Sequence, residues 1–141
     1  SRIVYEHGAS AEAGSGFGLK SGAIAAGDAT FNAYATSLTS RRTDANVLPI
    51  GTPSVVTHLI DIAGATATDE QQARVNGATP TYVYSGGTAT GNFTSQPLYI
   101  GRRGGTTAAS NMSLFQFILR GAATADLADA EAWVNSKTGA Y

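Results

Sequence analysis

The sequence predicts one all-β sandwich of about eight to ten antiparallel strands, followed by a single C-terminal helix. Short apolar runs recur at intervals of about 8–15 residues, and glycine- and serine-containing turns separate them, a spacing typical of sandwiches and jelly rolls. Only the final stretch has helical periodicity. The chain of 141 residues is one domain of ordinary size, long enough to bury a core.

The first strands follow from runs of β-branched and aromatic residues bounded by turn residues. Residues 30–36 alternate, with Phe31 on one face and Asn32 on the other. The full set of predicted strands lies within residues 2–120 and comprises 2–6, 16–27 (a hairpin turning at Ser21–Gly22), 30–36, 54–62, 72–75, 80–84, 97–103 and 113–120, with 37–53 as the longest loop.

Two features locate the middle of the sandwich. In the run 54–62, the residues Val56, His58 and Ile60 share a face that we expect to point to the core. His58 is the polar member of that face and is therefore expected to be a hydrogen-bonded, partly buried residue. Asn76–Gly77 can adopt positive φ angles at low cost, which predicts a tight hairpin turn between 72–75 and 80–84.

The C-terminal helix is predicted over residues 124–137. Thr124 is the expected N-cap, and Gly139 marks the stop. Asp126 and Asp129 lie where the helix dipole favours negative charge. An apolar stripe should dock on the sandwich; it consists of Leu127, Ala130 and Val134, with Trp133 packing at its border.

The composition excludes several classes of protein. Charged residues make up only 13% of the chain, about half the usual share, and the net charge is -1. A nucleic-acid binder would need a basic surplus. Because the chain has no cysteine, disulfides and cysteine-held metals are excluded. No apolar run is long enough to cross a membrane, and no signal peptide is visible.

The segments QPLYIGRRGG, NMSLFQFILRGA and AEAWVNSKTG resemble parts of a known family, the concanavalin A-like (laminin-G-like) jelly-roll domains of prophage and tailed-phage structural proteins. The segments VYEHGASAEAGSGFGL, LIDIAG and RVNGA fit as well, so the resemblance covers most of the chain. The family is tied to no single activity, so the resemblance implies a fold more than a function.

The chain departs from this family in two places. Members usually have further strands before the VYEHG region, so residues 1–141 are expected to be the C-terminal part of a longer chain, or to be completed by a partner that covers the open sheet edge. The family also often has Phe-Asn-Gly before the last strand. Here Ser110, Asn111 and Met112 stand there, which weakens the case for a site on that loop.

The residues do not predict catalysis. Glycoside hydrolysis needs two carboxylates about 5–10 Å apart, and the acids here are scattered without the alternating pattern of a glucanase strand. No nucleophile elbow is present. Asp61, Asp69 and Glu70 could supply oxygens to calcium, but their spacing is irregular, and solvated turn residues are the better interpretation. We therefore expect no enzyme activity, metal or cofactor.

Ligand binding is the chemistry that stays open. In a strand, Arg102 and Arg103 point to opposite faces, so they cannot clamp one ligand, and one of them is expected to pair with an acid. A glycan site would use aromatic rings to stack on sugars, with amides and arginine for the hydroxyls. The candidates are Tyr84, Asn92, Phe93, Arg103 and Asn111.

The resemblance implies a non-enzymatic structural or adhesion module of a bacteriophage or phage-like virion, such as a fibre, tail fibre or head-surface appendage. Its expected partners are other virion subunits or copies of itself, a trimer included, and a host cell-surface glycan, without nucleic acid or membrane insertion. Its expected location is the virion or the extracellular space. The alternatives are a lectin-like carbohydrate-binding module outside a virion and, less favoured, a polysaccharide hydrolase.

Overall fold

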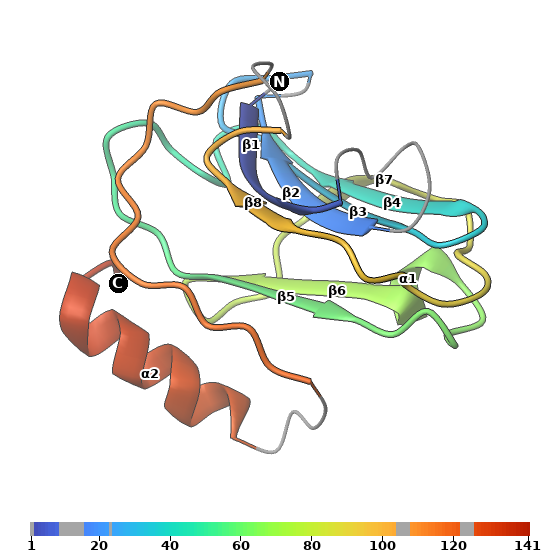
Figure 1. Ribbon diagram of the computed structural model, residues 1–141. Helices are drawn as coiled ribbons and strands as arrows, with labels where there is room; N and C mark the ends of the chain where they lie inside the picture. The colour runs from blue at the N-terminus through green and yellow to red at the C-terminus, as the bar shows by residue number, and fades with distance from the viewer. Residues whose placement is uncertain (1, 9–15, 23, 104–107, 122–125) are drawn as a thin grey trace.

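The computed structural model describes residues 2–8, 16–22, 24–103, 108–121 and 126–141. The chain forms a six-stranded antiparallel sheet, a two-stranded antiparallel sheet facing its inner side, and a C-terminal helix beyond the smaller sheet (Figure 1). The predicted class, mostly β with one C-terminal helix, is confirmed.

The large sheet has the strand order β7-β4-β3-β2-β1-β8, and β5 pairs with β6 in the small sheet. A single helical turn, α1, precedes β6. The bounds are β1 Arg2–His7, β2 Gly16–Ser21, β3 Ala29–Tyr34, β4 Leu38–Thr43, β5 Val56–Ile60, α1 Ala67–Glu70, β6 Gln71–Val75, β7 Tyr82–Gly86, β8 Leu98–Ile100 and α2 Leu127–Thr138.

The core lies between the two sheets. Leu19 on β2 sits opposite Phe31 on β3, and both side chains are buried. Ala73 of the small sheet closes the cluster from the other side. The predicted alternation of β3 is correct, because Phe31 and Ala33 are buried on the inner face.

One predicted loop is wrong, because residues 37–53 contain β4. Its inward-facing side chains are Thr39, Arg41 and Thr43, all buried and all polar. A pattern search for apolar alternation cannot detect such a strand. The strand forms because β3 and β7 pair with it on both sides.

One predicted strand is also wrong. Residues 113–120 have the alternation of a strand but follow an irregular path, without strand pairing to any described residue. Large apolar side chains along this path are exposed, including Phe115 and Leu119. Alternation shows which residues could be buried, whereas a strand also needs a partner edge.

Both predicted hairpins are wrong in their arms, although the turn at Asn76–Gly77 is correct. Asn76 and Gly77 have φ of 51° and 75°, as the tight turn requires. However, β6 pairs with β5, β7 pairs with β4, and only a Val75–Ala78 bridge closes this turn. In 16–27, the first arm is β2, whereas the second is a connection to β3 in which the Asp28 carboxylate accepts from the backbone N–H of Ile24.

Helix α2 begins at Leu127, with Asp126 as N-cap. The predicted stop at Gly139 is confirmed, because this residue ends the helix in the left-handed conformation. Thr124 lies outside the described residues. Trp133 does not pack on the sheet: it is 48% exposed, and Lys137 lies 5.7 Å from its ring. The helix turns Glu131 inward instead. None of the helices in the described part of the chain is long and apolar enough to span a membrane.

Candidate functional site

A cleft of about 760 Å³ lies between the inner face of β1 and β2, strand β5, residues 113–121 and helix α2. We call it the β5 cleft. It exists because the small sheet is narrow: β6 packs against β3 and β4. Beyond their contacts with His58 and Ala73 of the small sheet, Tyr5 and Leu19 on the inner face of β1 and β2 also border the cleft.

Aromatic rings line one end of the β5 cleft. The rings of His7 and Phe17 stack with 4.9 Å between their centroids, and Phe93 meets Phe17 edge-on at 5.4 Å. Further along, Phe117 of the unpaired segment meets Tyr5 edge-on at 5.5 Å. Phe93, predicted as a sugar-stacking residue, is half-buried, and its ring contacts those of Phe17 and His7.

A chain of hydrogen bonds crosses the cleft wall. The Tyr5 hydroxyl lies 2.6 Å from Nδ1 of His58, and Nε2 of His58 lies 3.0 Å from Oε1 of Gln71. Gln71 Nε2 donates to the Thr39 carbonyl at 2.7 Å, so its Oε1 is the acceptor for His58. The chain links β1, β5, β6 and β4, as expected for a hydrogen-bonded His58.

Burial sets the protonation of this chain. It lowers the pKa of His58 to about 4, with the Gln71 hydrogen bond opposing part of the shift. Burial also raises the pKa of Tyr5. Both side chains are therefore neutral near pH 7, and both ring nitrogens of His58 are engaged. Such a histidine stabilises the fold but is poorly placed to accept a proton from a substrate.

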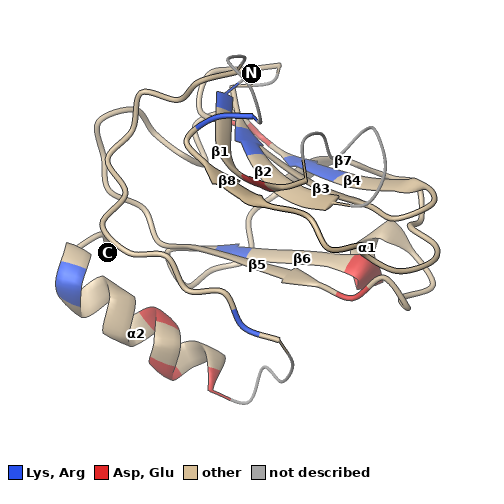
Figure 2. Cartoon of the chain, in the orientation of Figure 1, with Lys and Arg blue, Asp and Glu red and all other residues tan. Residues whose placement is uncertain are grey.

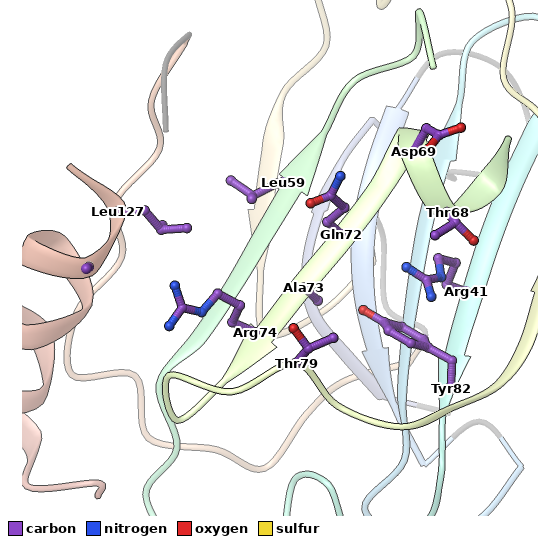
Figure 3. A pocket seen from close by; sticks show the side chains of 11 residues that line it. Arg41, Leu59, Thr68, Asp69, Gln72, Ala73, Arg74, Thr79, Tyr82 and Leu127 are labelled. Carbon is purple, nitrogen blue, oxygen red and sulfur yellow. The ribbon is translucent and has the colours of Figure 1, made fainter. Parts of the chain in front are cut away.

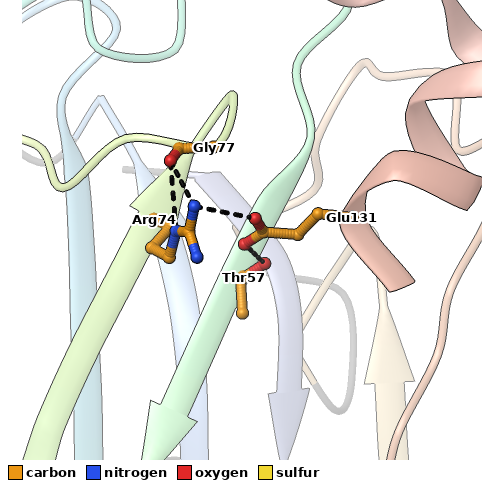
Figure 4. Close-up of polar contacts among 4 residues, drawn as sticks. All are labelled: Thr57, Arg74, Gly77 and Glu131. Carbon is orange, nitrogen blue, oxygen red and sulfur yellow. Dashed lines mark hydrogen bonds and ion pairs between the residues drawn. The ribbon is translucent and has the colours of Figure 1, made fainter. Parts of the chain in front are cut away.

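Glu131 fastens helix α2 to both strands of the small sheet (Figure 4). Its Oε1 accepts from the Thr57 hydroxyl at 2.7 Å, and its Oε2 lies 3.2 Å from Nη2 of Arg74. Arg74 also donates from Nε to the Gly77 carbonyl at 3.2 Å. This role of Glu131 is not predicted from the sequence. The signal that could have revealed it is its place between Leu127 and Val134 on the apolar stripe.

A second depression, about 630 Å³, lies along β6 and is more polar (Figure 3). We call it the β6 groove. Arg41 lies 3.4 Å from the centre of the Tyr82 ring, and it donates to the Gln71 carbonyl at 2.9 Å and to the Ser85 hydroxyl at 3.0 Å. Arg41 is therefore committed to the fold. Gln72 is exposed and lines the groove, so it is available to a ligand.

The predicted ligand residues do not converge. Tyr84 is exposed on β7, beside Arg42, whose guanidinium lies 5.7 Å from the ring. Arg103 follows β8, at the opposite edge of the large sheet, and five strand spacings amount to about 24 Å. Asn92 and Asn111 are exposed. Of the five predicted residues, Phe93 alone lines the β5 cleft.

The paired arginines split as predicted. Arg102 is exposed, whereas Arg103 points toward the sheet and donates from Nε and Nη2 to the two oxygens of Glu6, at 3.2 and 3.1 Å. The Glu6 side chain is only 1% exposed. A bidentate pair with a buried carboxylate is a structural role for Arg103.

The three acids that could supply oxygens to calcium make hydrogen bonds within the fold instead. Asp61 accepts from the backbone N–H of Ala63 at 3.0 Å, and the Thr66 hydroxyl donates to Asp69 at 2.7 Å. Glu70 was predicted as a solvated turn residue, but it is buried at the end of α1 and accepts from the N–H of Ala89. Within the described ranges, no three acids or histidines gather closely enough to hold a metal ion.

No protein-family model matches the chain, and no curated protein or solved structure matches it either. The functional interpretation therefore depends on the two depressions, the surfaces beside them and the resemblance noted in the sequence. Of these, the β5 cleft and the exposed segment along it are the more unusual for a free globular protein.

Proposed function

We propose that the chain is a non-enzymatic structural and adhesion module of a phage or phage-like particle, with a concanavalin A-like jelly-roll sandwich as its fold. The resemblance of most of the chain, and above all of its C-terminal half, to phage structural domains supports the assignment to a particle. Two facing sheets with a terminal helix support the sandwich. Its work is assembly with other subunits, which include copies of itself.

The observation that carries assembly is the exposure of residues 112–119, which we call the apolar segment. Its large side chains are open to solvent; they are Met112 (37%), Leu114 (46%), Phe115 (69%), Ile118 (46%) and Leu119 (60%). The segment carries no charged residue (Figure 2). An apolar surface of this kind marks an interaction site, because burying it against a partner gains about 25 cal/mol per Å².

The polar groups support assembly over catalysis. Glu6 and Glu131 are each held by an arginine, and Glu70 by a backbone N–H. His58 has both nitrogens engaged. A catalytic acid or base must instead be free to meet a substrate proton.

Sedimentation from low to high micromolar concentration tests assembly. We expect the wild-type chain to form oligomers, and the double substitution Phe115→Ser with Leu119→Ser to give folded monomers. The matched control is Ile24→Ser with Ile50→Ser, because these side chains are also exposed, at 74% and 90%, but do not line the β5 cleft. A wild-type monomer across the whole range overturns the proposal.

The β6 groove favours glycan adhesion as a second activity. Beside the Tyr82 ring, the groove is lined by the amide of Gln72 and the hydroxyls of Thr68 and Thr79, polar groups of the kind that bond sugar hydroxyls (Figure 3). Weak sites of this kind become strong when a particle displays several copies. On an array of bacterial surface glycans, Gln72→Ala should lose binding while Phe93→Ala keeps it. The reverse result indicates that the glycan binds in the β5 cleft. If the wild type binds no glycan, the adhesion proposal is contradicted.

A further inference from the structure

Strand β5 has one unpaired edge. Two hydrogen bonds fix the phase of its pairing with β6: Asn76 N–H donates to the Val55 carbonyl at 2.9 Å, and Asp61 N–H to the Glu70 carbonyl at 2.8 Å. In an antiparallel ladder, every second residue bonds to the partner. The backbone groups of Val56, His58 and Ile60 therefore point away from β6, and they have no hydrogen-bond partner among the described residues.

The outer edge of β6 is different, because it is already covered. Its outward residues include Gln71 and Val75. The Gln71 carbonyl accepts from Arg41, and Val75 exchanges two hydrogen bonds with Ala78, at 2.8 and 3.1 Å. Side chains and bridges that occupy an edge prevent another strand from adding there. Growth of the small sheet is therefore directed to β5.

Across the β5 cleft lies a second line of unpaired backbone. Residues 111–119 make no backbone hydrogen bond within the described part of the chain. Both this line and β5 border the same cleft. A strand inserted between them could pair with β5 on one side and face the backbone of the segment on the other, the geometry of β-strand addition.

The walls of the cleft define the side chains of such a strand. Toward the large sheet they are apolar and aromatic, with Tyr5 and Leu19. Toward the helix they are Leu127, Ala130 and Val134. Successive side chains of a strand point to opposite faces, so the occupant must be apolar on both. About five residues, some 16 Å, match the free edge of β5.

The charges around the cleft require an uncharged occupant. Glu131 is neutralised by Arg74, and Arg120 lies 2.6 Å from Asp126 at the end of the cleft. His58 is neutral. A charged side chain in the cleft would find these ionic groups already paired, and an unpaired buried charge is strongly unfavourable. Charge complementarity therefore selects a neutral segment.

We propose that the β5 cleft accepts one β-strand from another polypeptide subunit of the particle, an extended, uncharged segment of about five residues with apolar side chains on both faces. The inserted strand extends the small sheet from the edge of β5 and lies against the part of the large sheet that borders the cleft. This inference rests on the proposed function and assigns the cleft to a subunit other than a copy of this chain.

The probe is a synthetic peptide with the central sequence Val-Leu-Val-Ile-Val-Leu-Val between lysines that keep it soluble. Titrated into the full chain, it should slow amide hydrogen exchange at Val56, His58 and Ile60 by at least about tenfold. The matching peptide with proline at its central position should not, because it lacks the N–H at that position and breaks the strand.

Two aspartate substitutions locate the site. Ile60→Asp places a charge at the edge of β5 and should abolish peptide binding. Ile50→Asp makes the same change at a side chain that is 90% exposed outside the cleft, and it should leave binding intact. Circular dichroism checks folding, and if Ile60→Asp fails to fold, the exchange data on the wild type decide alone.

Three results overturn the inference: no peptide binding, binding that Ile60→Asp leaves unchanged, or protection of the same three amides without peptide. The last result means that a second copy or the chain's own segment fills the cleft. If the chain is oligomeric but its β5 amides exchange freely with and without peptide, the strand-binding site is excluded, whereas the assembly function still stands. A chain that stays monomeric in sedimentation contradicts the assembly function itself.

Discussion

Arg74 on β6 and Glu131 on α2 form an ion pair, with 3.2 Å between the guanidinium Nη2 and the carboxylate Oε2. The two partners are unequally buried, because 34% of the arginine side chain is exposed but only 5% of the glutamate side chain. Thr57 on β5 donates to the other carboxylate oxygen. One carboxylate thus joins the helix to both strands of the small sheet.

Because the two partners are unequally buried, substituting them should lower the free energy of unfolding by different amounts. Arg74→Ala leaves the buried carboxylate with Thr57 as its donor, and should lower the free energy of unfolding by about 2–3 kcal/mol. Glu131→Gln keeps the Thr57 bond and lets water solvate the arginine, so it should cost about 1 kcal/mol. Urea denaturation measures both. Asp129→Asn, on the exposed side of the helix, is the control and should cost no more than about 0.5 kcal/mol, because an exposed acid in the first turn interacts only weakly with the helix dipole. Equal losses from Arg74 and Glu131 contradict the assignment.

The two adjacent arginines after β8 should also differ. Arg103→Ala removes a bidentate partner from the buried carboxylate of Glu6 and should lower the free energy of unfolding by about 2 kcal/mol. Arg102→Ala removes an exposed side chain and should change it by less than about 0.5 kcal/mol. Thermal and urea denaturation of both variants check this. A similar effect of the two substitutions would show that the Glu6 pair contributes nothing.

This difference between the arginines was predictable because it is local. Side chains alternate along a strand whatever the rest of the chain does. The same holds for the turn at Asn76–Gly77 and the stop at Gly139, which depend on the φ angles of single residues. Features set by one or two residues were read correctly from the sequence.

The predictions for strand β4 and for the segment 113–120 were wrong in opposite senses, and for the same reason: a loop was predicted for the first and a strand for the second. β4 faces inward with Arg41, which is stabilised by the Tyr82 ring and the Gln71 carbonyl, partners far away in the chain. The segment 113–120 has the right apolar alternation but no described strand pairs with it. Pairing is a property of two segments, and no single segment encodes it.

The candidate site could be predicted only in part. Phe93 is a predicted binding residue and does line the β5 cleft. The rings that it contacts, those of Phe17 and His7, belong to β2 and β1, which are distant in the sequence. The cleft itself depends on the narrowness of the small sheet, which follows from the pairing of β7 with β4 rather than with β6. That choice between edges is a tertiary one, as is the inward turn of Glu131.

The turn at Asn76 should separate backbone strain from hydrogen bonding. Asn76 has φ of 51°, and its side-chain oxygen accepts from the Val55 N–H at 2.9 Å. Asn76→Gly loses the hydrogen bond but tolerates the conformation, so it should cost about 1 kcal/mol. Asn76→Ala adds the cost of a left-handed backbone and should lose about 2 kcal/mol. Urea denaturation that ranks the two variants equally would exclude strain at this position.

Acid should destabilise the fold through His58. Burial lowers its pKa from 6.5 to about 4, so between these values the unfolded chain binds a proton that the folded chain does not. Its contribution is complete above pH 6.5 and is lost as the pH falls toward 4. The loss is at most about 3 kcal/mol, and less because the ring keeps some contact with water. His58→Gln removes this titration. The difference in unfolding free energy between wild type and variant should therefore shrink from about pH 7.5 to about pH 4.5, while carboxylates common to both cancel. A difference independent of pH would show that His58 titrates normally.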